Sequence, residues 1–453
     1  MRWVVDGQQR ITSLACALTE RGARDKRYCI WFDPDDLSFH STPATGPHSH
    51  WVSVWRLLDA AELGDFLYGW GPAADGARRR ALLEAGKRIR EYPVLTYTIE
   101  SDDVHLLREV FRRSNEYGRS LKESDIFNAL VGSPGDGVES LRHALRELPW
   151  GVDGIKDDTL MMAVKGILGQ DPTHRIKESL TGELESRYAG AIDQARWALP
   201  TAVDFLRADA GIPHRRLLPY RVPLIVLARF FSQFPHASAH TRRLLRRWVW
   251  RGILSGAHQD SDKTRLRASL KAIRQDENRS AVRLLDLVPE RANEWQKPPD
   301  KSFDARSAVQ RVGLLALASL QPRMLGRGGN NAAVEIPALL DAEGARAIRL
   351  IHSGKSPVGG WGVENRVVHP PVRGLHRLLV QRAKAFGTDD IVLRSHGIDS
   401  KGVAALVADD RGAFLRARLA VIERIANGLG SALAEWHHPA RRPLVHALLA
   451  AAE

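Results

Sequence analysis

Apolar and polar positions alternate with two different periods in the first 130 residues, and this mixture predicts an α/β region. Ile11–Thr19 carries apolar residues at helical spacing, and Ala77–Tyr92 is a second predicted helix. Tyr28–Phe32 and Tyr92–Ile99 are rich in aromatic and β-branched residues, which favours strands, and Arg2–Val5 predicts a short strand before them.

The pattern changes after Gly132–Gly137, a cluster of helix and strand breakers that marks a domain boundary. Strand patterns nearly vanish beyond it, and the apolar spacing becomes helical. The predicted helices are Asp158–Leu168, Gly182–Arg207, Val222–Phe234, Thr241–Leu254, Lys263–Arg274, Ser307–Leu320 and Phe414–Leu433. Trp295–Asp300 is a second linker. The chain is therefore expected to be α+β, with an α/β domain at 1–131, a helical domain at 138–292 and a mainly helical domain at 301–453.

Composition narrows the class of protein. Of 453 residues, 44% are hydrophobic and 26% are charged, which argues against a disordered chain. The net charge is 66 − 53 = +13, which favours a polyanionic partner such as DNA; arginines on an ordinary solvated surface are the alternative. Two cysteines, Cys16 and Cys29, exclude a disulfide framework. The start has no signal peptide and no apolar stretch is long enough to span a membrane, so we expect a soluble, cytoplasmic protein with no membrane partner.

The first motif with candidate chemistry is Asp6-Gly7-Gln8-Gln9-Arg10, between a predicted strand and a predicted helix. Unpaired amides and the dipole at a helix start favour a bound anion. Gly7 allows the backbone to approach a phosphate closely, and Arg10 can grip phosphate oxygens in pairs. Thr12 adds a hydroxyl in the first turn, and Asp6 is suited to hold Arg10, a water or Mg²⁺. A simple turn capped by Asp6 is the structural alternative.

The second motif is Phe111–Leu121, with the sequence FRRSNEYGRSL. Asn115 can ligate a metal through its carbonyl or hydrogen-bond a base or ribose. Gly118 permits a left-handed turn, and Ser120 with Glu123 makes a capping box for the next helix. Turn chemistry between two helices explains the same residues, so both interpretations stay open.

Taken together, VVDGQQRITSL and FRRSNEYGRSLKESDIFNAL resemble the paired signature of the N-terminal domain of GmrSD-type restriction endonucleases. The second half of the signature matches at Phe111, Asn115, Gly118 and Leu121. The resemblance is specific only in the first 130 residues. It implies a domain similar to the ParB and sulfiredoxin fold, and the family usually has several tens of residues before this motif, so the domain is expected to be incomplete at its N-terminus.

The resemblance implies a site for a nucleoside triphosphate, GTP or ATP, with Mg²⁺. Asp6 and Arg10 become the candidate catalytic residues, with Arg10 stabilising charge on the transferred phosphoryl group. The candidate cofactor-binding residues are Gly7, Gln8, Gln9, Arg10, Thr12 and Asn115. Asn115 is also the candidate metal ligand.

The implied function is a nucleotide-hydrolysing component of a DNA restriction or anti-phage defence system, acting on foreign or modified DNA. The alternative is a non-catalytic DNA-binding sensor with a degenerate nucleotide site that works with a separate nuclease. Either such a nuclease or a second copy of the chain is an expected partner. No complete HNH nuclease centre is expected: His352, His369, His376 and His396 are candidates, but two prolines follow His369 and no acidic residue lies close after it.

A basic face on the predicted helix Thr241–Leu254 is the candidate contact to DNA phosphates. It consists of Arg242, Arg243, Arg246 and Arg247, with Arg251 beyond them. The alternative is a core helix whose solvated arginines cover apolar surface with their stems.

Overall fold

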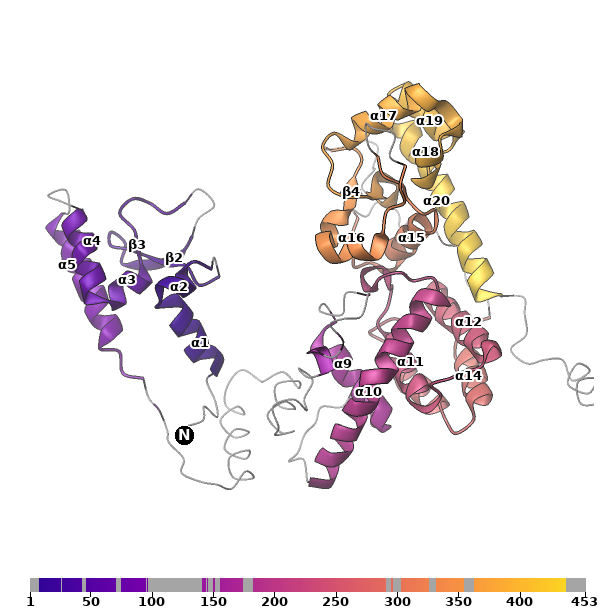
Figure 1. Cartoon of the computed structure of the whole chain (residues 1–453), viewed down its shortest axis with the longest axis horizontal. Coiled ribbons are helices and arrows are strands. Elements are labelled where there is room, and N and C mark those ends of the chain that lie inside the picture. The colour runs from indigo at the N-terminus through magenta and orange to yellow at the C-terminus, as the bar shows by residue number, and fades with distance from the viewer. Residues whose placement is uncertain are drawn as a thin grey trace, which may run out of the picture. The chain divides into compact units, whose positions relative to one another are not determined.

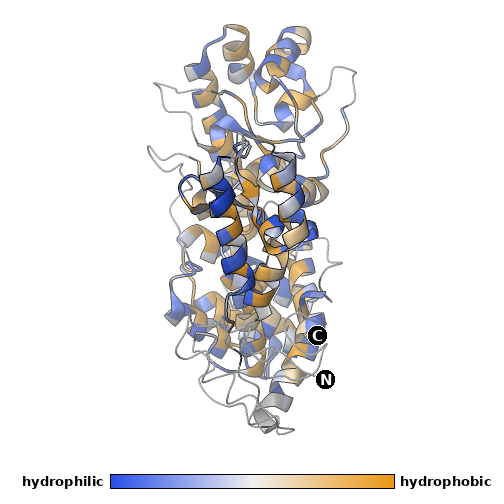
Figure 2. Ribbon diagram, turned by 90° about the vertical axis from the view of Figure 1, so that its left-hand side faces the viewer, coloured by the Kyte–Doolittle hydropathy of each residue, from blue (hydrophilic) through white to orange (hydrophobic). Residues whose placement is uncertain are grey.

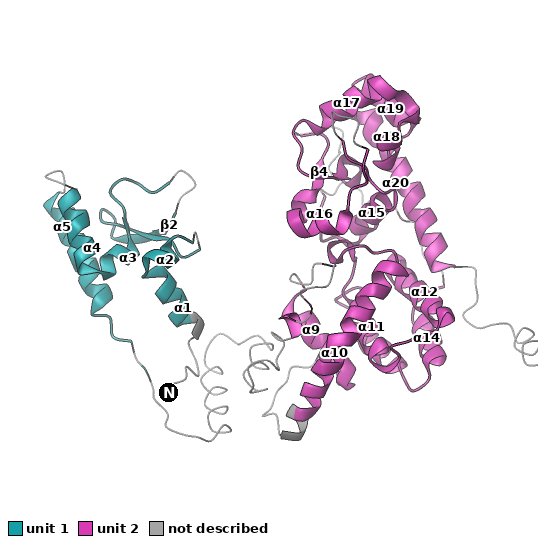
Figure 3. Ribbon diagram, in the orientation of Figure 1, with its two compact units in different colours: residues 1–120 teal, residues 121–453 magenta. Residues whose placement is uncertain are grey.

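The computed structural model describes residues 8–25, 27–42, 46–70, 75–94, 96, 141–143, 145, 150, 155–173, 182–290, 295, 303–325, 331–353 and 362–436. The chain divides into two compact units, residues 1–120 and 121–453 (Figure 3). Helices dominate both units, and the described strands form one three-stranded and one two-stranded sheet (Figure 1). The predicted α+β, mainly helical class is confirmed, whereas the division into three domains stays a prediction.

Unit 1 is built around a small antiparallel sheet with the strand order β2-β1-β3. β1 (Ile30–Asp33) pairs with β2 (Ser38–Ser41) on one side and with β3 (Val52–Ser53) on the other. The turn between β1 and β2 passes through Leu37, which has a positive φ of 58°. β1 confirms the strand predicted at Tyr28–Phe32; β2 and β3 were not predicted, because neither is a run of aromatic and β-branched residues.

Five helices accompany this sheet in the described part of unit 1. They are α1 (Gln8–Ala17), α2 (Glu20–Ala23), α3 (Val54–Leu58), α4 (Ala60–Gly69) and α5 (Gly76–Arg90). Their buried core consists of Phe32, Val52, Leu57, Leu63, Leu67 and Leu82. α3 and α5 pack so closely that a Cβ at Gly86 would lie 2.8 Å from the Leu57 carbonyl oxygen. The helices predicted at 11–19 and 77–92 are confirmed as α1 and α5.

Two strand predictions in unit 1 have different outcomes. Arg2–Val5 lies outside the described residues. The strand predicted at Tyr92–Ile99 is wrong where the structure describes it, because Tyr92–Val94 and Thr96 belong to no strand. Pro93 lacks the amide hydrogen that a ladder needs, which disfavours strand pairing there.

The described part of unit 2 is a helical assembly. Its helices of eight or more residues are α9 (Asp157–Leu168), α10 (Gly182–Ala208), α11 (Val222–Gln233), α12 (Ala239–Ser255), α13 (Lys263–Ala272), α14 (Glu277–Asp286), α15 (Ala308–Ser319), α16 (Ile336–Glu343), α17 (Leu375–Phe386), α19 (Ser400–Val407) and α20 (Arg411–Ala434). All seven helices predicted beyond the first breaker cluster are present, with ends shifted by up to three residues.

Aspartate side chains define where many helices of both units begin. Each accepts a hydrogen bond from a backbone amide in the first helical turn, which satisfies a donor that has no acceptor within the helix. The capping residues are Asp59, Asp75, Asp262, Asp276, Asp390, Asp399 and Asp410. The helix starts are thus encoded locally.

Unit 2 holds two apolar clusters. The larger one runs through α9 to α15 and includes Trp150, Trp248 and Trp250, all fully buried. The smaller one gathers α17, α19 and the start of α20 around Leu379 and Phe414. Between them lies an antiparallel pair of strands, β4 (Ile348–Leu350) and β5 (Arg366–Val368), that the sequence pattern did not predict.

Hydrophilic and hydrophobic residues are interleaved along the helices, as Figure 2 shows. None of the helices in the described part of the chain is long and apolar enough to span a membrane. Cys16 and Cys29 are both free thiols.

Candidate functional site

The start of α1 carries the part of the first motif that the structure describes. Asp6 and Gly7 lie outside the described residues, and α1 begins at Gln8, directly after them. Gln8, Gln9 and Arg10 therefore make up the first turn of a ten-residue helix. The described part of the motif is therefore helical.

Arg10 and Thr12 are both exposed side chains. Further along α1, Ile11 and Leu14 are 54% and 53% exposed, so this helix packs through its C-terminal end, where Ala17 is buried. Asn115 and the rest of the second motif lie outside the described residues, so their roles as nucleotide and metal ligands stay predictions.

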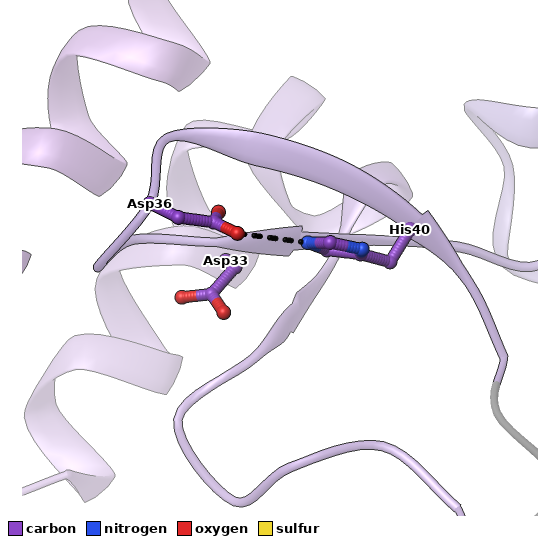
Figure 4. A group of neighbouring side chains, drawn as sticks. All are labelled: Asp33, Asp36 and His40. Atoms are coloured by element: carbon purple, nitrogen blue, oxygen red, sulfur yellow. Dashed lines mark hydrogen bonds and ion pairs between the residues drawn. The ribbon is translucent and has the colours of Figure 1, made fainter.

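A second candidate site was not foreseen from the sequence: a group of carboxylates and histidines around the turn between β1 and β2. Asp33, Asp36 and His40 bring one ligand atom each within 4.8 Å of one another (Figure 4). Asp33, Asp35 and His50 form a second triad of the same kind. The only hint in the sequence was the run Asp33-Pro34-Asp35-Asp36, because the two histidines come from β2 and from the loop before β3.

The spacing in the second triad suits a divalent cation. His50 Nε2 lies 3.5 Å from Asp33 Oδ1 and 3.6 Å from Asp35 Oδ2. Two ligands of a tetrahedral zinc ion, each about 2.1 Å from the metal, lie about 3.4 Å apart. The geometry is thus compatible with an ion, but distance alone does not require one.

Each carboxylate in this group also has a protein partner. The Trp51 indole donates to Asp33 at 2.6 Å, and Arg78 donates to both oxygens of Asp35 at 2.5 and 2.6 Å. The bond from Arg78 holds the pKa of Asp35 below its ordinary value, and a bond from Ser38 does the same for the pKa of Asp36. The group is therefore satisfied without an ion, and it ties the β1–β2 turn to α5.

Trp51 also closes the group on one side. Its indole stacks on the His40 imidazole, with ring centroids 4.5 Å apart and planes 11° apart. His48 meets the same indole edge-on at 4.8 Å. The stack restricts the orientation of His40, since the ring cannot turn without losing contact with a buried tryptophan.

The third candidate site, the basic face of α12, contacts the rest of unit 2. Arg242 is paired with Asp209 and lies over the rings of Phe205 and Phe231. Arg243 and Arg246 donate to Glu435, just past the end of α20, at 2.9 and 2.6 Å.

Arg247 and Arg251 are buried on the same side of α12, at 3% and 2% exposure. Arg251 donates to the carbonyl oxygens of Ala434, Glu435 and Trp436. Burial lowers the pKa of Arg247 to about 10, so it remains charged near neutral pH. Internal carboxylates and carbonyls already engage these guanidinium groups, and a role of the helix in DNA binding stays a prediction.

Four histidines in the C-terminal part of unit 2 fall into two groups. His369 Nε2 accepts a hydrogen bond from the Leu325 amide at 2.9 Å, and Nδ1 donates to the Pro370 carbonyl at 2.8 Å. His396 donates to the Arg323 carbonyl at 2.8 Å, and burial lowers its pKa to about 3. Both rings are thus used in holding the backbone.

His352 and His376 form the other group. The structure brings their rings to 4.4 Å between centroids, although they are 24 positions apart in the chain. This pairing depends on β4 and α17 lying together, which no local pattern signals.

No protein-family model matches the sequence, and a search of the curated proteins finds no match either. The resemblance to the GmrSD-type N-terminal domain therefore stays a prediction that depends on the two motifs.

Proposed function

We propose that this chain is a nucleotide-binding, NTP-hydrolysing component of a DNA restriction or anti-phage defence system, with a ParB-like N-terminal domain. One observation supports it above the others: α1 begins at Gln8, directly after Asp6-Gly7. In this proposal Asp6-Gly7 precede the helix and the motif lies at its N-terminus, the position at which backbone amides and the helix dipole favour a phosphate.

The residues of the motif have distinct roles in this proposal. The amides of the first turn of α1 bind phosphate oxygens, and Gly7 lets the backbone approach them. Arg10 is exposed at the start of the helix, where its guanidinium binds two oxygens and stabilises the charge that develops during phosphoryl transfer. Thr12 contributes a hydroxyl, and Asp6 and Asn115 orient the nucleotide.

Mg²⁺, when bound, would neutralise charge on the phosphate oxygens. Asn115 is the ligand that the resemblance suggests. Asp33 and Asp36 also offer carboxylate oxygens, but the hydrogen bonds from Trp51 and Ser38 already engage them, so this proposal gives them no part in holding Mg²⁺.

Calorimetric titration with GTP and with ATP, each in the presence of Mg²⁺, tests the proposal. Arg10→Ala should weaken binding of whichever nucleotide the native protein binds by about 1.5–3 kcal/mol, the range for charge-assisted hydrogen bonds. Arg21→Ala, an exposed arginine on α2 outside the motif, is the matched control. Equal affinity in the native protein and Arg10→Ala would remove Arg10 from the site.

The second candidate function is a non-catalytic DNA sensor that works with a separate nuclease. The net charge of +13 favours it, because a basic protein attracts the phosphate backbone whether or not it hydrolyses nucleotide. Steady-state release of phosphate from the bound nucleotide separates the two: turnover that Arg10→Ala abolishes supports the enzyme, and binding without turnover supports the sensor.

A further inference from the structure

His352 is a buried side chain whose ring nitrogen has an unmet hydrogen bond. It follows β4 and is 8% exposed. Asn365 holds its backbone on both sides, since the His352 amide donates to Asn365 Oδ1 at 2.9 Å and Asn365 Nδ2 donates to the His352 carbonyl at 3.2 Å. Among the described residues, His352 Nε2 nevertheless has no hydrogen-bond partner. A buried polar atom left in this state costs stability, so it needs a functional or structural reason.

Two rings fix the orientation of this imidazole. His376, the second residue of α17, lies 4.4 Å away between ring centroids, and Phe414 on α20 meets the His352 ring at 5.5 Å and 70°. Phe414 is 1% exposed, whereas the side chain of His376 is 33% exposed. The pair of histidines therefore leads from the interior of unit 2 to its surface.

Arg411 adds a cation to the pair. It is the first residue of α20 and precedes Phe414 by three positions, so both side chains lie on the same face of the helix. Burial lowers the pKa of His352 to about 4, with smaller contributions from the charges of His376 and Arg411. Its Nε and one terminal nitrogen are buried and, within the described part of the chain, have no hydrogen-bond partner.

The neighbouring carboxylates do not satisfy these nitrogens. The side chain of Asp409 is 87% exposed and lies 3.9 Å from His376 Nε2, beyond hydrogen-bond distance. Asp410 caps α20 through the Ala413 amide at 2.9 Å. Among the described residues, the buried nitrogens of His352 and Arg411 are thus left without an acceptor.

We propose that His352, His376 and Arg411 form a binding site for a phosphate group. Guanidinium and imidazole nitrogens are donors that suit phosphate oxygens, and the N-terminus of the 24-residue helix α20 adds a favourable dipole. A divalent cation is disfavoured, because Arg411 would repel it. This site lies in unit 2 and is independent of the nucleotide motif at α1.

The test uses the full chain and inorganic phosphate as the probe, in calorimetric titrations at constant ionic strength. Arg411→Met should weaken phosphate binding by about tenfold or more, the equivalent of one charge-assisted hydrogen bond. His352→Phe keeps the ring contacts but removes the nitrogens, and it should also weaken binding. Arg416→Met removes a charge from an exposed position of the same helix and should bind phosphate as the native protein does.

A native protein that binds no phosphate, or an Arg411→Met variant that binds it with native affinity, would overturn the proposal. Zn²⁺ binding that His352→Phe abolishes, without any phosphate binding, would also overturn it. If His352→Phe does not fold, as judged by thermal melting without phosphate, Arg411→Met and Arg416→Met still decide the outcome, because Arg411 is only half-buried.

A second arm identifies the source of the phosphate. Short duplex DNA that competes with inorganic phosphate in the native protein, but binds Arg411→Met more weakly, would place a nucleic-acid backbone in the site. If duplex DNA does not compete with inorganic phosphate, the natural ligand is instead a small phosphate compound. Repeating the comparison of the native residue with Arg411→Met in an Arg10→Ala background removes the proposed nucleotide site from the titration, so failure of the nucleotide proposal and failure of this one are distinguishable.

Discussion

Arg243 Nε lies 2.9 Å from both carboxylate oxygens of Glu435, although the two residues are 192 positions apart. Arg246 donates to the same carboxylate, and Arg251 donates to the carbonyl oxygens around it. Burial disfavours the charged form of Glu435, but the bonds from Arg243 and Arg246 outweigh it and hold its pKa below the ordinary value. The basic face of α12 thus binds the C-terminal end of α20.

Glu435→Gln should destabilise unit 2. It removes the anion from a cluster in which Arg247 is buried, and the remaining positive charges then repel one another. We expect a loss of about 1–3 kcal/mol in the free energy of unfolding, measured by urea denaturation followed by circular dichroism. Glu423→Gln on α20 is the control. A Glu435→Gln variant as stable as that control would show that the cluster does not contribute to stability.

Arg243 is the arginine of this cluster that remains most open to an external phosphate, since its side chain is 53% exposed. If α12 contacts DNA, Arg243→Ala should reduce the slope of log affinity against log salt concentration by about 1, as expected for one lost phosphate contact. Arg279→Ala, an exposed arginine on α14 with its own acidic neighbour, is the control. Identical slopes for Arg243→Ala and the native protein would leave α12 with the structural role alone.

Arg418 should be essential for the fold of the C-terminal part. Its side chain is fully buried and donates to the carbonyl oxygens of His396, Val363, Glu364 and Arg366. Burial lowers its pKa to about 9, so it is still charged at neutral pH. Arg418→Met leaves these acceptors without their donor, and we expect about 3–5 kcal/mol of destabilisation in urea denaturation. Arg416→Met should cost little, and equal losses in both variants would contradict this role.

Gly252 lies against a histidine that cannot move freely. A Cβ at this position would be 2.0 Å from His258 Nε2, and His258 is buried with that nitrogen 3.1 Å from the Trp248 carbonyl oxygen. Gly252→Ala should therefore destabilise the protein by about 3 kcal/mol through overpacking.

The double variant Gly252→Ala/His258→Ala tests the cause. The smaller side chain at position 258 makes room for the new methyl group. The double variant should therefore lose less free energy of unfolding than the two single variants lose together. Strict additivity would show that the close contact is relieved in some other way.

Stability should fall as the pH is lowered from 6.5 towards 5. Burial lowers the pKa of His258 and of His396 to about 3, so these rings take up protons at a lower pH in the folded state than in the unfolded state. The stabilisation that these neutral rings contribute is fully present above their pKa in the unfolded state, near 6.5. It is lost as the pH falls towards their pKa in the folded state.

Each histidine contributes up to about 1.4 kcal/mol per pH unit to this slope. Urea denaturation at pH 7.5, 6.0 and 5.0 measures it. His258→Gln should make the dependence shallower, and His236→Gln, which changes an exposed histidine, should not. A native protein equally stable at pH 7.5 and 5.0 would contradict the neutral, buried state of these rings.

The sequence by itself determined many of the helices, because their signals are local, but it did not predict α14, α16, α17 or α19. Apolar spacing identifies α9 to α13, α15 and α20, and an aspartate N-cap marks the start of α13 and of α20. It also singled out the Asp6–Arg10 motif, because the motif is one contiguous segment; its role as a phosphate site stays a proposal. The strands β2 to β5 were missed, since they are too short to show a period and, unlike β1, do not lie in a run of aromatic and β-branched residues.

Only the tertiary structure decided which side chains meet. The charges on α12 are visible in the sequence, but their pairing with Glu435 depends on the return of the chain through α20. His352, His376 and Arg411 come from three separate elements, and so do Asp33, His40 and His50. Such clusters form because packing of apolar faces brings distant segments together, and that packing is a property of the whole unit rather than of any stretch of sequence.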